Sequence, residues 1–158
     1  MSTLEILRWL HVVGATVLLG AGVGIAFFML MAHRTGNPLL IAHVASTVVI
    51  ADFVFTATAV IAQPITGYFL ARMEGWSLND GWLLLSISLY VLTGLFWLPV
   101  VFLQIRMRDL AREAARTDTT LATKYFELFW LWFLCGIPAF SAVMVIVWLM
   151  LAKPAIPL

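Results

Sequence analysis

Residues 6–31 read ILRWLHVVGATVLLGAGVGIAFFMLM and contain one charged side chain, Arg8. A bilayer core needs about 20 consecutive apolar residues per helix, so this stretch is long enough to cross a membrane. The whole chain has 158 residues, of which 63% are hydrophobic and 11% are charged. A water-soluble domain of this size cannot bury so large an apolar fraction. The sequence therefore predicts an integral membrane protein.

Three further apolar stretches follow the first, separated by short polar breaks. Together they predict an all-α fold, a bundle of four antiparallel transmembrane helices at residues 6–31, 43–69, 82–103 and 126–151. After the third stretch, charges of both signs recur three and four residues apart, which predicts a cytoplasmic extension of that helix to about residue 116. The remaining segments are too short for a soluble domain, so residues 1–158 are expected to form a single membrane domain.

The basic residues predict the orientation. With four spans, the loops after the first and third helices share one side, and both termini share the other. The first side has six basic residues and the second has three: Arg34, Arg106, Arg108, Arg112, Arg116 and Lys124 against Arg8, Arg72 and Lys153. The positive-inside rule then places both termini in the periplasm. Because these few charges lie at helix ends, no nucleic-acid partner is expected.

His11 is a candidate haem ligand. It lies roughly 6 Å below the outer boundary of the first helix, at about 1.5 Å per residue. The same helical face continues through Gly14, Ala15 and Gly22, whose small side chains leave room for a flat cofactor. Neutral imidazole is a good axial ligand for haem iron, so the pattern predicts b-type haem held by His11. The alternative is that His11 simply hydrogen-bonds a neighbouring helix.

Polar residues also form a stripe on each of the second and third helices, at spacings that place each stripe on one helical face. The stripes consist of Asp52, Thr56, Ala59, Gln63 and Thr66, and of Ser86, Tyr90, Thr93, Trp97 and Gln104. We expect the two stripes to meet inside the bundle and to line a cavity in its outer half. Gln63 and Tyr90 are predicted to contact the cofactor there.

Asp52 lies roughly 13 Å into the bilayer, where desolvation favours the protonated carboxyl. We interpret it as part of a proton relay or as an anchor for a cofactor, with Thr56 and Gln104 as further interior polar residues. The alternative is a protonated Asp52 that bridges helices through threonine or tryptophan. Pro64, Pro99 and Pro138 each release a backbone carbonyl that a neighbour must satisfy, because proline has no N–H group.

Four segments carry a resemblance to a known family. They are LRWLHVVGATVLLGAGVG, ADFVFTATAVIAQPITGYFLA, LYVLTGLFWLPVVFLQIRMRDLA and GIPAFSAVMVIVWLMLAKP. In order and spacing they resemble a bacterial family of predicted integral membrane proteins known as domain of unknown function 2269. The resemblance implies a four-helix protein of the bacterial inner membrane, and it implies no particular chemistry.

More remotely, His11 followed by a glycine-rich apolar run is similar to HemJ-type protoporphyrinogen oxidases and CopD-type copper-resistance membrane proteins. In HemJ-like proteins the histidine that His11 matches is implicated in haem binding, together with a lysine in the third helix. This sequence has no lysine in residues 82–103. For copper, Met29, Met31, Met144 and Met150 are available soft ligands, but they are scattered and form no cluster.

These patterns lead to one functional hypothesis and one alternative. The hypothesis is a haem b protein that transfers electrons or oxidises a hydrophobic substrate, a quinol or a porphyrinogen, and is thus a possible membrane oxidoreductase. The alternative is a cofactor-free protein for transport or complex assembly, with a polar path around Asp52 and Gln63. The expected partners are membrane lipid, a quinone or porphyrin, and a second copy of the chain that packs on small-residue faces of the first helix.

Overall fold

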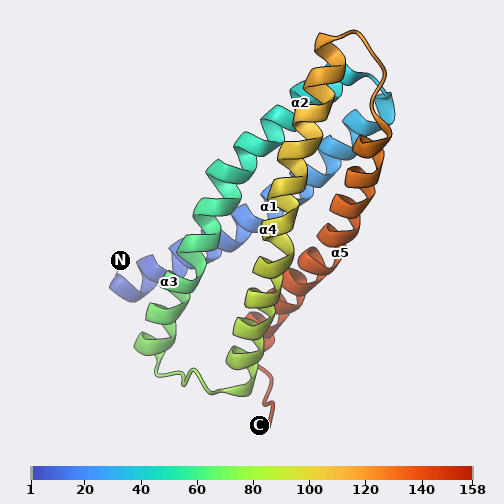
Figure 1. The fold of residues 1–158 in the computed structure, drawn as a ribbon. Coiled ribbons are helices and arrows are strands. Elements are labelled where there is room, and N and C mark those ends of the chain that lie inside the picture. The colour runs from blue at the N-terminus through green and yellow to red at the C-terminus, as the bar shows by residue number, and fades with distance from the viewer. Residues whose placement is uncertain (1, 158) are drawn as a thin grey trace.

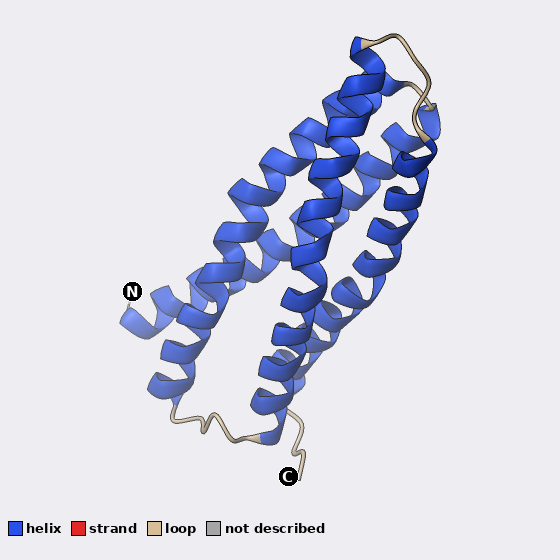
Figure 2. Cartoon of the chain, in the orientation of Figure 1, coloured by secondary structure: helices blue, strands red, loops and turns tan. Residues whose placement is uncertain are grey.

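The computed structural model describes residues 2–157, and almost all of them are helical (Figure 1; Figure 2). The helices are α1 (Thr3–Thr35), α2 (Pro38–Ala51), the π-helix η1 (Asp52–Thr56), α3 (Ala57–Glu74), α4 (Gly81–Arg116) and α5 (Thr123–Ala152). The segments α2, η1 and α3 follow one another without a break and form one long helix. Residues 2–157 contain no strand. The four long apolar helices packed against one another confirm the predicted all-α, four-helix membrane fold.

The helix ends explain where each span stops. The Ser2 hydroxyl accepts a hydrogen bond from the Glu5 N–H, and the Glu5 carboxylate accepts one from the Ser2 N–H, which starts α1 with a capping box. At the other end Gly36 adopts the left-handed conformation, with φ of 63°. Asn37 then caps α2, which begins at Pro38. The helix α4 runs unbroken to Arg116, so the third helix extends beyond residue 103, and the cytoplasmic position of this extension stays a prediction.

Both termini lie at one end of the bundle together with the α3–α4 loop (Figure 1). We call this the terminal end. The opposite end, which we call the arginine end, holds the α1–α2 and α4–α5 loops, as four antiparallel crossings require. It carries Arg34, Arg106, Arg108, Arg112 and Arg116. The compartment that each end faces stays a prediction.

The outer surface is apolar along the middle of the bundle. Large side chains that a soluble protein would bury are exposed on it, including Ile61 and Leu95 at 64% and Phe102 at 68%. Lipid chains can cover such side chains, because the helices satisfy their own backbone hydrogen bonds. The chain thus has four candidate spans of a multi-pass membrane protein.

Side-chain packing differs between the two ends. Near the arginine end, Met29, Ile41, Met107, Tyr125 and Phe129 are fully buried in a core shared by α1, α2, α4 and α5. A smaller cluster around Trp82 and Leu149 lies at the terminal end. There α3 packs on α1 but makes few contacts with α4, and Figure 1 shows α3 and α4 diverging. The helices α3 and α4 therefore do not pack directly on each other at the terminal end.

Candidate functional site

A cavity of about 520 Å³ lies between the helices and opens partly to the outer surface, where its lining residues Val23, Phe27 and Ile137 are exposed. All four long helices contribute to its wall, which is predominantly apolar. Pockets of this size and character are typical of small-molecule sites. Its polar lining residues are Asp52, Thr56, Tyr90, Thr93, Trp97, Gln104, Trp132 and Ser141.

Glycines on three helices help to create this cavity. Gly22 of α1, Gly94 of α4 and Gly136 of α5 all line it. A Cβ atom added to any of the three would have no atom within 4 Å beyond its own helix. An alanine would therefore fit at each position, and it would improve helix propensity by roughly 1 kcal/mol. The three glycines leave open a space that common side chains would partly fill.

Asp52 is the central polar residue of the cavity, and only 3% of its surface is exposed. Its Oδ1 atom accepts a hydrogen bond from Trp97 Nε1 at 3.3 Å. When the Gln104 amide is oriented to satisfy its neighbours, its nitrogen donates to Asp52 Oδ2 at 3.2 Å and its oxygen accepts from Trp132 Nε1 at 3.1 Å. This network connects η1, α4 and α5. No Lys, Arg or His in residues 2–157 forms an ion pair with Asp52.

Thr56 lies one turn beyond Asp52 in the same π-helix. Thr56 is 8% exposed and lines the cavity, and its Oγ1 atom makes no hydrogen bond of standard geometry within residues 2–157, although the Asp52 carboxyl lies close to it. Buried hydroxyls normally have a hydrogen-bond partner, because burial removes their bonds to water. Short π-helices are rare and occur often at functional sites. The sequence predicted Asp52 and Thr56 as interior polar residues but gave no sign of the π-helix.

Tyr90 joins two helices that otherwise have few contacts. Its hydroxyl donates to the backbone carbonyl of Val60 on α3. Val60 lies four residues before Pro64, and proline cannot supply the helical N–H that this carbonyl would normally accept. The prediction that a neighbour satisfies the carbonyl released by Pro64 is thus confirmed. The helices α3, α4 and α5 each continue through their proline.

His11 lies at the interface between α1 and α3 and does not line the cavity. Its Nδ1 atom is 2.8 Å from the Thr66 hydroxyl, which also lies 2.8 Å from the Ala62 carbonyl. Since the hydroxyl has one proton to donate, the arrangement suits donation from Thr66 to Ala62 and from His11 Nδ1 to Thr66. A Cβ atom at Gly67 would lie 3.1 Å from the His11 ring, so this glycine admits the imidazole.

Gln63 makes a second contact across the same interface, in which a side chain of α3 reaches the backbone of α1. Its Nε2 atom donates to the His11 carbonyl at 2.8 Å. The amide occupies the space where a Cβ atom at Gly14 would be. Each helix therefore has a glycine that accommodates a polar side chain of the other. The sequence predicted a hollow surface for a cofactor beside His11, but Gln63 fills this space at Gly14. The partly buried Ala15 does not line the cavity.

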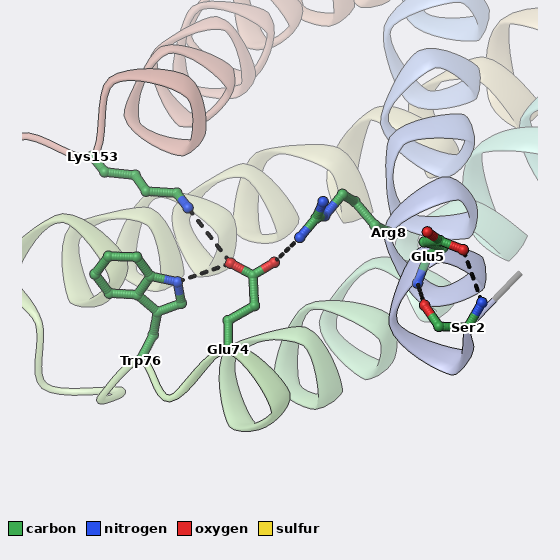
Figure 3. A network of polar contacts seen from close by, with 6 residues as sticks. All are labelled: Ser2, Glu5, Arg8, Glu74, Trp76 and Lys153. Atoms are coloured by element: carbon green, nitrogen blue, oxygen red, sulfur yellow. Dashed lines mark hydrogen bonds and ion pairs between the residues drawn. The ribbon is translucent and has the colours of Figure 1, made fainter.

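Glu74 ties together three parts of the terminal end (Figure 3). One carboxylate oxygen is 2.6 Å from Arg8 Nη2 of α1, and the other accepts from Trp76 Nε1 at 3.2 Å and lies 3.8 Å from Lys153 Nζ. The hydrogen bond from Arg8 is the largest influence on the pKa of Glu74, which lies below its usual value; the bond from Trp76 acts in the same direction. Glu74 follows the apolar stretch 43–69 and is outside the membrane-spanning part.

A second hollow, of about 550 Å³, lies on the outer surface between α4 and α5. Its lining is apolar apart from the exposed Arg106, and it is an open groove. The interior cavity is the better candidate for function because it brings several buried polar groups together.

The other two histidines lie away from both hollows. His33 stacks on Phe129 with ring centroids 3.6 Å apart, and His43 is exposed.

The structure therefore divides the predicted site residues into two groups. Asp52, Thr56, Tyr90 and Gln104 line one cavity, whereas His11, Gly14 and Gln63 form the α1–α3 interface. The cavity also extends further toward the arginine end than predicted, reaching Gln104 and Leu30. In residues 2–157 no group of three or more His, Cys, Asp or Glu side chains is placed to hold a metal ion.

No curated protein and no solved structure significantly matches this chain. One family model does match, over residues 5–154. Because this match covers nearly the whole length, the resemblance noted from the four sequence segments is confirmed. The chain belongs to the family described as predicted integral membrane protein (DUF2269).

Proposed function

We propose that this protein binds a hydrophobic small molecule inside the bilayer, in the cavity lined by Asp52 and Thr56. One observation carries the proposal: a buried carboxyl and a buried hydroxyl face the same apolar cavity of about 520 Å³. Polar groups are costly within a membrane protein, and those that are retained commonly mark a site. The ligand would be an apolar molecule with at least one polar group.

The quinol hypothesis and the transport part of the alternative share one requirement with this function. Oxidation of a quinol and transport of a lipophilic compound both need an intramembrane site for an apolar molecule. A polar path around both Asp52 and Gln63 has less support, because Gln63 donates to the His11 carbonyl and does not line the cavity.

Haem in this cavity is poorly supported by the available donors. The lining contains no His, Met, Cys or Lys, and the Tyr90 hydroxyl, a possible iron ligand, already donates to Val60. At the α1–α3 interface, His11 keeps its Nε2 atom free of hydrogen bonds to the described residues, but Gln63 fills the space at Gly14. Haem b at His11 stays a prediction. Absorption spectra of oxidised and reduced protein, with His11→Ala as the control, test it.

The test of the proposed function is to fill the cavity from a position where a side chain causes no clash. Gly94→Leu adds a side chain to the cavity wall, and Gly20→Leu adds one where there is also open space but no cavity. The purified variants are equilibrated with a small-molecule extract of the host membrane, and bound compounds are identified by mass spectrometry.

We expect wild type and Gly20→Leu to retain the same class of compound and Gly94→Leu to lose it. Equal retention by all three proteins would contradict binding in this cavity. Circular dichroism and gel filtration verify that both variants remain folded.

A further inference from the structure

The surroundings of Asp52 supply hydrogen bonds but no positive charge. Both carboxyl oxygens accept from neutral donors, Trp97 Nε1 at 3.3 Å and the Gln104 amide at 3.2 Å. Among the residues that line the cavity, Asp52 and Tyr90 are the only titratable ones, and none is basic. A buried carboxylate is normally paired with a cation, because desolvating a lone charge is expensive. Because no basic group lines the cavity, only a cation from outside the chain could pair with an ionised Asp52.

Aromatic rings form much of the remaining wall. They belong to α1, α4 and α5 and are Phe27, Tyr90, Trp97, Trp132, Phe133 and Phe140. Aromatic rings attract cations, and sites for organic ammonium groups are commonly built from them. The cavity is far larger than a bare metal ion needs, and most of its wall is apolar. The surroundings therefore suit a bulky organic cation better than an inorganic one.

We propose that the ligand of this cavity is a lipophilic organic cation with Asp52 as its counter-ion. The inference rests on the proposed function and adds the charge of the ligand to it. The apolar part of the cation would fill the space beside Gly22, Gly94 and Gly136, where no side chain intervenes. The Thr56 hydroxyl lies in the cavity wall close to Asp52 and is within reach of a polar group of the same ligand.

The test compares two probes of related shape and different charge. Tetraphenylphosphonium is a lipophilic cation, and triphenylphosphine oxide is a neutral compound with similar rings. Each is titrated into detergent-solubilised full-length protein, and binding is followed by tryptophan fluorescence, since Trp97 and Trp132 line the cavity. Wild type, Asp52→Asn, Gly94→Leu and the control Gly20→Leu are measured in the same detergent.

We expect wild type to bind the cation more tightly than the neutral probe. Asp52→Asn should weaken binding of the cation by at least about 30-fold, which is the order expected when one partner of a buried charge pair is removed. It should leave the affinity for the neutral probe nearly unchanged. Gly94→Leu should weaken the binding of both probes, whereas Gly20→Leu should weaken the binding of neither.

Other outcomes separate the two proposals. If wild type binds the neutral probe at least as tightly as the cation and Gly94→Leu abolishes that binding, the cation inference is overturned and the proposed function stands. If neither probe binds, or if Gly94→Leu has no effect, both proposals fail. The wild-type comparison requires no variant, so it decides the cation inference even if Asp52→Asn does not fold.

Discussion

Removing the Tyr90 hydroxyl tests how the bundle compensates for a proline inside a membrane helix. In Tyr90→Phe the ring is retained, but the Val60 carbonyl loses its side-chain donor. A buried acceptor without a donor costs about 1–3 kcal/mol, whereas measured hydrogen bonds between membrane helices average about 0.6 kcal/mol. Because Val60 is only partly buried, we expect a loss of about 1 kcal/mol in the free energy of unfolding.

The structure also predicts how this loss depends on residue 64. Pro64→Ala restores a backbone N–H that can donate to Val60, so Tyr90→Phe should be nearly neutral in that background. The measurement is a double-mutant cycle by reversible SDS unfolding in mixed micelles, followed by circular dichroism. Tyr68→Phe is the control, since Tyr68 is exposed and has no side-chain hydrogen bond among the described residues. An equal loss in the wild-type and Pro64→Ala backgrounds would refute the reasoning.

Two further predictions concern the contacts of α1. Gly14→Ala should be less stable than Gly20→Ala by about 1 kcal/mol in the same unfolding assay, because a Cβ atom displaces the Gln63 amide in the first case and meets no atom in the second; equal stabilities would contradict the close approach seen at Gly14. Glu74→Gln should lower stability by less than about 1 kcal/mol, since the ion pair with Arg8 is solvent-accessible. Because the pKa of Glu74 is lowered in the folded protein, its contribution is present above the unfolded-state pKa and is lost as pH falls through the lower folded-state pKa. The free energies of unfolding of wild type and Glu74→Gln are measured over an acidic pH series. A difference between the two proteins that does not narrow at low pH would contradict this pH dependence.

Much of the fold follows from local sequence. Runs of apolar residues fix the four spans, because each helix must satisfy its backbone hydrogen bonds and present apolar side chains to lipid. Local capping residues such as Asn37 and Pro38 fix where a helix restarts. The need for a donor to the Val60 carbonyl also follows from the sequence, since it depends only on a proline four residues later.

The candidate site was only partly predictable. The spacing of Asp52 and Thr56 placed them on one helical face, and the structure places both at the cavity together with Gln104. For His11 the same kind of reasoning left a haem ligand and a helix contact open. Thr66 and its neighbours on α3, which surround His11 in the structure, are more than 50 positions away in the chain.

The sequence by itself determined the membrane class, the four helices, their antiparallel order and the stripes of polar residues. Tertiary structure alone decided that Gly14 accommodates Gln63 and that Gly67 accommodates His11. It also decided that the chain forms a π-helix from Asp52 to Thr56 and that glycines on three helices leave one shared cavity. The physical reason is that spacing along a helix fixes which residues share a face. The rotation and axial position of one helix against another depend on side-chain packing among all four helices at once.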